Sequence, residues 1–127
     1  MKVTGLSWVG VGTDDFARTL DFFTDVLGLR TAVADHARGV ALLHAGEGHV
    51  VEIFGPGTRG RSLTSPPVVA FEVEDVQAAR AELLAAGVEL IGDIGAWNGF
   101  EWLYFRSPDA QVFAVKKTPP PGWEQTA

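Results

Sequence analysis

The sequence repeats one order of predicted elements, and this repeat constrains the fold more than any other feature. Sliding one half over the other by about 60 residues places Asp15 on Asp75, and Gly28 within one place of Gly87. Aspartate side chains cap helix N-termini, and glycine adopts the left-handed conformation that ends helices. The sequence therefore predicts an α+β fold of two tandem βαβββ modules.

The first module is expected to span residues 3–55. Apolar alternation predicts a strand over 3–11, and the polar residues 13–15 can cap a helix that ends at about Leu27. The apolar residues Phe16, Leu20 and Phe23 recur at helical spacing before it. Three short β-prone runs follow, near residues 29–34, 39–44 and 49–54. Residues 56–66 lack periodicity and predict a linker.

The second module is expected to span residues 67–117, and it follows the same order. A strand over 68–73 precedes a helix capped by Asp75 and stopped by Gly87. Further strands are predicted over 88–94, 99–106 and 111–116. Prolines at 119–121 cannot continue a strand, so residues 119–127 are interpreted as a C-terminal tail and residues 1–118 as one domain.

Composition and charge exclude several classes of function. The chain is 46% hydrophobic and 20% charged, which is typical of a globular protein. Its net charge of −6 argues against nucleic acid and anionic membranes as partners, because no basic patch offsets the repulsion. The sequence shows no signal-peptide pattern and no long apolar run, so the expected location is cytoplasmic. The absence of cysteine excludes disulfides and thiolate metal sites and is neutral about location.

Residue parity separates two faces of the predicted strands. One face is uniformly large and apolar and is expected to pack under the helices: Val9, Val11, Val51, Ile53, Val69, Phe71, Val73, Phe113 and Val115. The other face is mixed, which suits a cavity better than a core: Trp8, Gly10, Val50, Glu52, Phe54, Val68, Ala70, Glu72, Val112 and Ala114. We therefore expect the function to reside on the mixed face.

Four segments carry a family resemblance. These are residues 6–11, the run 21–29 (DFFTDVLGL), and Tyr104 to Asp109 (YFRSPD), together with the FEVED run at 71–75. In this order they resemble the vicinal oxygen chelate superfamily of glyoxalases, bleomycin-resistance proteins and extradiol dioxygenases. The resemblance covers about residues 3–117. It implies an open, cup-shaped mixed β-sheet.

The resemblance also implies a metal site that this sequence does not reproduce. Metal-dependent members place one ligand on each of four central strands, and those positions here correspond to Trp8, Glu52, Val68 and Ala114. Only Glu52 can bind a cation, and one carboxylate supplies neither the affinity nor the geometry that a divalent metal needs. The sequence therefore predicts no metal and no cofactor, with a His44 and Glu52 pair as the less favoured alternative.

Aromatic residues dominate the expected cavity face instead. Ligand contacts are predicted from Trp8, Glu52, Phe54, Val68, Phe100, Trp102, Tyr104 and Ala114. Aromatic side chains offer large contact areas at low entropic cost, so this face suits a planar ligand. The alternative is that Trp8 and Trp102 fill vacated space or pack a dimer interface.

Family members that lack the metal set resemble the bleomycin-resistance type, which bind a drug without chemistry. This implies a homodimeric protein that sequesters an aromatic natural product or antibiotic, with Glu52 as hydrogen-bond acceptor. An alternative is a metal-independent lyase, isomerase or cyclase in which Glu52 is the general base, assisted by His44 or Tyr104. A metal enzyme with altered ligands is the third hypothesis.

Overall fold

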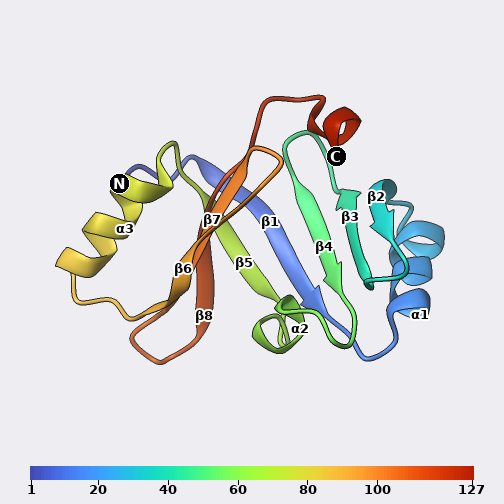
Figure 1. Cartoon of the computed structure of the whole chain (residues 1–127), viewed down its shortest axis with the longest axis horizontal. Helices are drawn as coiled ribbons and strands as arrows, with labels where there is room; N and C mark the ends of the chain where they lie inside the picture. The colour runs from blue at the N-terminus through green and yellow to red at the C-terminus, as the bar shows by residue number, and fades with distance from the viewer. The chain divides into compact units, whose positions relative to one another are not determined.

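The computed structural model describes residues 1–127 and forms two compact units (Figure 1). One unit contains residues 8–68, and the other contains residues 1–7 together with 69–127. None of the helices combines the length and apolar character needed to cross a bilayer. The chain thus follows the two-module order predicted from the repeat.

The unit of residues 8–68 contains strands in the order β2-β3-β4-β1. Strand β1 (Gly5–Gly12) runs parallel to β4 (Val50–Phe54). Strand β3 (Val40–His44) pairs antiparallel with β4 and with β2 (Arg30–Asp35). These bounds agree with the predicted strands to within about two residues.

A helix follows β1 in this unit, as predicted. Helix α1 (Phe16–Asp21) continues into a π-helical turn, η1 (Phe22–Val26). The Asp15 carboxylate caps it by accepting a hydrogen bond from the Arg18 backbone N–H at 3.2 Å. Gly28 adopts φ +74° directly after the helix, so the predicted glycine stop is confirmed.

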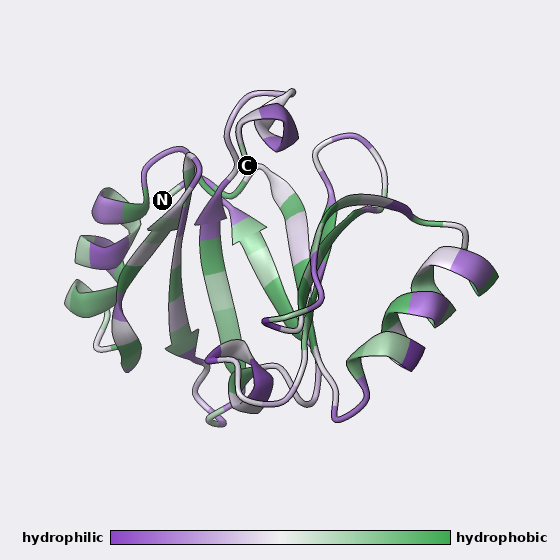
Figure 2. Ribbon diagram, turned by 45° about the vertical axis from the view of Figure 1, so that its right-hand side comes forward, coloured by the Kyte–Doolittle hydropathy of each residue, from purple (hydrophilic) through white to green (hydrophobic).

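Helix α1 buries its apolar side against one face of the strands (Figure 2). Four core residues are at most 6% exposed: Leu20, Ala41, Leu43 and Ile53. Partly buried apolar residues pack around them: Phe16, Phe23, Leu29 and Val51. Val51 and Ile53 therefore lie on the helix side of β4, as the parity analysis predicted. Trp8, Glu52 and Phe54 have the opposite parity and point away from this core.

The segment between the modules contains a structure that the sequence analysis did not foresee. A short helix, α2 (Gly60–Leu63), lies within it. Thr64 follows at 0% exposure, and its hydroxyl donates a hydrogen bond to the Gly60 carbonyl at 2.6 Å. The Thr64 carbonyl accepts a hydrogen bond from the Gly12 backbone N–H at 2.9 Å, which ties the segment to the end of β1.

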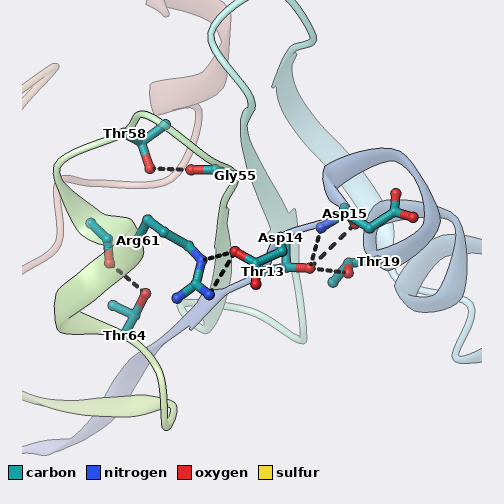
Figure 3. A network of polar contacts seen from close by, with 9 residues as sticks. Thr13, Asp14, Asp15, Thr19, Gly55, Thr58, Arg61 and Thr64 are labelled. Carbon is teal, nitrogen blue, oxygen red and sulfur yellow. Dashed lines mark hydrogen bonds and ion pairs between the residues drawn. The ribbon is translucent and has the colours of Figure 1, made fainter.

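An ion pair fixes the same segment to the start of α1 (Figure 3). Arg61 donates from Nε and Nη2 to one Asp14 carboxylate oxygen, at 3.0 and 2.7 Å. Asp14 is 84% exposed, so solvent screens this pair and it contributes at most about 1 kcal/mol. The pair links α2 to the residue before the Asp15 cap of α1.

The second unit contains strands in the order β5-β8-β7-β6. Strand β5 (Val68–Glu72) runs parallel to β8 (Val112–Lys117), which pairs antiparallel with β7 (Phe100–Arg106). Strand β6 (Leu90–Trp97) forms the outer hairpin with β7. Each of these strands was predicted, and the α+β class is confirmed.

Helix α3 (Val76–Ala85) occupies the place in this unit that α1 occupies in the other. The Asp75 carboxylate accepts a hydrogen bond from the Ala78 backbone N–H at 3.0 Å, and Gly87 adopts φ +76°. The core beneath it contains Val73, Val76, Ala79, Leu83, Leu103 and Val115, each at most 8% exposed. The same cap, stop and core positions therefore recur, as the repeat predicted.

The turn between β7 and β8 contains a hydrogen-bonded aspartate followed by a strained alanine. The Ser107 and Gln111 side chains donate hydrogen bonds to the Asp109 carboxylate. These contacts, with that of the Ser107 hydroxyl the largest, lower the pKa of the Asp109 carboxyl. The next residue, Ala110, adopts φ +67°, a left-handed conformation that favours glycine.

Replacing Ala110 with glycine should therefore stabilise the chain. Removing the Cβ relieves about 1 kcal/mol of left-handed strain, less the greater entropy that glycine has in the unfolded chain. Urea denaturation of Ala110→Gly is expected to show a higher midpoint with an unchanged slope. Gly122→Ala introduces a Cβ at φ +95° and should shift the midpoint downward. A lower midpoint for Ala110→Gly would contradict the strain argument.

The C-terminal residues pack against the second unit. Residues Trp123–Thr126 form a 3-10 helix, η2, and Trp123 is 8% exposed. The Trp123 ring meets the Phe100 ring edge-on, with centroids 4.8 Å apart. The Asn98 side-chain amide donates to the Trp123 carbonyl at 2.7 Å. Residues beyond the prolines thus contribute to the packing of β7.

Candidate functional site

The candidate site in residues 8–68 is built around Trp8 and Glu52. The parallel register of β1 and β4 places Gly10 beside Glu52, one step along the same face from Trp8. The Trp8 indole Nε1 donates a hydrogen bond to Glu52 Oε1 at 2.9 Å. Trp8 is 4% exposed, so this bond is sheltered from solvent. The carboxylate that the family resemblance singled out is thus engaged by the Trp8 indole.

Packing fixes the position of the Trp8 indole. Its ring meets Phe54 edge-on, with centroids 6.3 Å apart. It also lies over Gly10, where an added Cβ would come within 2.8 Å of Trp8 Cζ2 and 2.7 Å of Thr64 Cγ2. Glycine at position 10 therefore leaves the space that the indole occupies. Because Thr64 follows α2, the segment between the modules helps to shape this site.

His44 lies near Glu52 on the same face of the strands. The antiparallel register of β3 and β4 pairs His44 with Val50 and Leu42 with Glu52. His44 is thus a diagonal neighbour of Glu52, within reach of long side chains. Of the three histidines, it is the one that the parity analysis placed on this face.

The second unit presents an aromatic row along β7. The register pairs Trp102 with Lys116 and Tyr104 with Ala114, so these four residues share one face. Trp102 lies across Gly95 of β6, where an added Cβ would come within 2.6 Å of its Cζ2. Trp102 and Tyr104 are half-buried and keep part of their rings accessible.

Phe100 is enclosed by other aromatic rings. It is 2% exposed, stacks on Trp97 at 6.1 Å between centroids, and meets Trp123 edge-on. The ammonium group of Lys116 lies 4.8 Å from the Phe100 ring centroid and 5.9 Å from that of Trp102. These distances are within the range of cation–π attraction.

Lys116 and Trp123 were missed by the sequence analysis. The signal for Lys116 was available, since it follows Ala114 by two residues on β8 and must share its face. No local pattern indicates Trp123, because it lies beyond a proline run that breaks periodicity. The remaining predicted contacts, Val68 and Ala114, are buried aliphatic residues at 2% and 1% exposure.

The predicted site residues thus fall into two groups, one in each unit. Trp8, Glu52, Phe54 and Val68 belong to residues 8–68, and Phe100, Trp102, Tyr104 and Ala114 belong to the other unit. Within the first group the structure brings Trp8 into contact with Glu52 and Phe54. Within the second it aligns the three aromatic residues along β7.

The donor set does not fit the metal that the family resemblance implies. Residues 1–127 contain no group of three or more histidine, aspartate or glutamate side chains that could hold an ion. One Glu52 oxygen already accepts the Trp8 indole N–H. Trp8, Val68 and Ala114 offer no lone pair suited to a divalent cation.

Comparison with protein-family models identifies the family of this chain. The model of the Glyoxalase/Bleomycin resistance protein/Dioxygenase superfamily matches residues 5–110. The chain belongs to this superfamily. The resemblance drawn from the sequence motifs is therefore confirmed, and so is the glyoxalase type of α+β fold.

Several solved structures share the fold of this chain at low identity. Methylmalonyl-CoA epimerase from Mycobacterium tuberculosis is 20% identical with a TM-score of 0.70, over 93% of this chain and 90% of that one. The Streptomyces coelicolor epimerase in complex with 2-nitronate-propionyl-CoA is 18% identical with a TM-score of 0.68, over 94% and 100%. A superfamily member from Vibrio splendidus is 17% identical with a TM-score of 0.62, over 88% and 97%. A sequence comparison with curated proteins finds no match.

Proposed function

We propose that this chain is a metal-independent binding protein that sequesters an aromatic small molecule, a natural product or antibiotic. The hydrogen bond from Trp8 to Glu52 carries the proposal. Metal-dependent relatives are expected to hold a metal ligand at each of these two positions. In this chain the two side chains instead bond to each other, with the Trp8 indole as donor and the Glu52 carboxylate as acceptor. The superfamily description names bleomycin resistance proteins beside glyoxalases and dioxygenases, so a binding role lies within the range of this family.

The aromatic row of β7 supports an aromatic ligand. Trp102 rests on Gly95 with one side of its indole and is half-buried, so part of the residue remains accessible to a ligand. Tyr104 follows on the same face and adds a hydroxyl that can donate or accept. Stacking contributes about 0.5–1.5 kcal/mol per aromatic pair beyond the burial of apolar area. Two such rings orient a planar molecule without any bond-making chemistry.

Calorimetric titration with a panel of planar aromatic antibiotics tests this proposal. We expect stoichiometric binding with recovery of unchanged ligand, and about a tenfold weaker affinity for Trp102→Ala, since 1.4 kcal/mol corresponds to tenfold. Phe22→Ala is the matched control, because Phe22 is an exposed aromatic residue on η1. Wild-type affinity is expected for this control. Absence of heat with every class of compound would contradict the proposal.

The enzymatic alternative makes a different prediction for Glu52. The epimerase neighbours show that this fold can carry an isomerase, and His44 lies beside Glu52 on the same face. If Glu52 were a general base, a bound compound would be converted and Glu52→Gln would abolish the conversion while retaining binding. Unchanged ligand in wild type favours sequestration. A stoichiometric divalent cation in purified protein, found by elemental analysis, would overturn both hypotheses in favour of a metal enzyme.

A further inference from the structure

The C-terminal segment, residues 118–127, packs against one end of the aromatic row on β7. The row consists of Phe100, Trp102 and Tyr104, which share one face of the strand because they alternate along it. Phe100 is 2% exposed, whereas the other two residues are half-buried. The Trp123 indole meets the Phe100 ring edge-on, with centroids 4.8 Å apart. Trp123 thus makes with Phe100 the kind of contact that an aromatic ligand makes.

The start of the segment is fixed to β5 and to the turn between β6 and β7. The Thr118 backbone N–H and hydroxyl donate hydrogen bonds to the two Glu72 carboxylate oxygens, at 2.9 and 2.8 Å. Pro119 then packs on Gly99, where an added Cβ would come within 2.9 Å of the Pro119 Cβ. The prolines at 119–121 restrict the backbone further. The segment therefore leaves β8 along a constrained path.

Asn98, in the same turn, holds the end of the segment. Its side-chain N–H donates to the Trp123 carbonyl at 2.7 Å, and its side-chain oxygen accepts from the Thr126 hydroxyl at 2.9 Å. Asn98 adopts φ +49°, a left-handed conformation that asparagine tolerates better than most residues. Both polar atoms of this amide are therefore used to keep the Trp123 indole against Phe100.

We propose that Trp123 sets the length of the ligand that the β7 row accepts, by closing the row at Phe100; this inference rests on the proposed binding function. Alternate residues on a strand are about 7 Å apart, so Trp102 and Tyr104 offer a ligand contacts over one such interval. Phe100 would add a second interval of the same length. The closed row therefore selects compact aromatic molecules, and removal of the Trp123 indole admits longer ones.

Ligand length is tested with two neutral compounds that share one ring system. Benzothiazole has two fused rings, and 2-(4-aminophenyl)benzothiazole extends it by a further aromatic ring. Because both are neutral, the Lys116 ammonium, 4.8 Å from the Phe100 ring centroid, does not separate them by net charge. In calorimetric titrations, Trp123→Ala is expected to bind the long compound about fivefold more tightly than wild type does, the size of one aromatic contact. Its affinity for the short compound should stay unchanged.

Trp123→Phe is the conservative variant for this experiment. It keeps an aromatic ring against Phe100 and should keep the wild-type ratio of the two affinities. An equal change for both compounds in Trp123→Ala would indicate a general effect on the fold and would overturn the inference. If wild type binds both compounds and the ratio is the same in Trp123→Ala, only this inference fails. If neither protein binds either compound, the proposed binding of aromatic molecules is contradicted as well.

Asn98→Asp releases the segment without changing any aromatic ring. A carboxylate cannot donate to the Trp123 carbonyl, and aspartate tolerates the left-handed backbone. Hydrogen exchange of the amides in residues 122–127 should be faster than in wild type, and the affinity ratio should shift toward the long compound. Circular dichroism verifies that each variant retains its fold. Faster exchange with an unchanged affinity ratio would show that the segment does not limit ligand length.

Discussion

Leu43→Ala and Leu103→Ala are each expected to lower the free energy of unfolding by about 3 kcal/mol. Both side chains are 0% exposed, and each lies in the core beneath the helix of its own unit. Removing the Cγ methine and the two Cδ methyl groups costs the transfer free energy of those groups and leaves a cavity that close-packed neighbours fill poorly. This loss is a large part of the stability of a domain this size.

The two substitutions also test the structural repeat. Leu43 is paired with Val51 and Leu103 with Val115, so the two leucines occupy equivalent places in β3 and β7. Urea denaturation should therefore give losses that agree to within about 1 kcal/mol. Leu84→Ala, on the exposed side of α3, should change stability by no more than about 0.5 kcal/mol. If Leu43→Ala or Leu103→Ala lowered the free energy of unfolding no more than Leu84→Ala does, the described packing would be contradicted.

Gly10→Ala is expected to disrupt the Trp8 site and to destabilise the chain by about 1–3 kcal/mol. The new methyl group would lie 2.8 Å from Trp8 Cζ2 and 2.7 Å from Thr64 Cγ2, so the indole must move. Displacement of the indole lengthens the 2.9 Å hydrogen bond to Glu52. A partly buried carboxylate that loses a donor incurs part of the desolvation cost of an unpaired group.

Nuclear magnetic resonance of the indole N–H groups provides the measurement for this substitution. The Trp8 Nε1–H signal should shift and lose protection from hydrogen exchange in Gly10→Ala, whereas the other three tryptophan signals stay in place. In a Trp8→Phe background the ring carbons that collide with the methyl group are absent. The destabilisation by Gly10→Ala should then be smaller, and equal costs in the two backgrounds would contradict a steric cause.

The sequence by itself determined the order of the elements, because each signal is local. Asp15 and Asp75 cap their own helices, Gly28 and Gly87 stop them, and alternation along β4 separates Ile53 from Glu52. Capping, left-handed backbone and strand parity depend on residues within a few positions of each other. The superfamily could be recognised from the same motifs for this reason.

Only the tertiary structure decided what each candidate side chain contacts. Trp8 and Glu52 are 44 residues apart, and the parallel register of β1 with β4 brings the indole N–H to the carboxylate. Trp123 covers Phe100 from beyond the proline run, and Thr64 packs beside Trp8 from a segment without periodicity. Such contacts depend on strand register and on side-chain volume, which a one-dimensional pattern of apolar and polar residues does not encode.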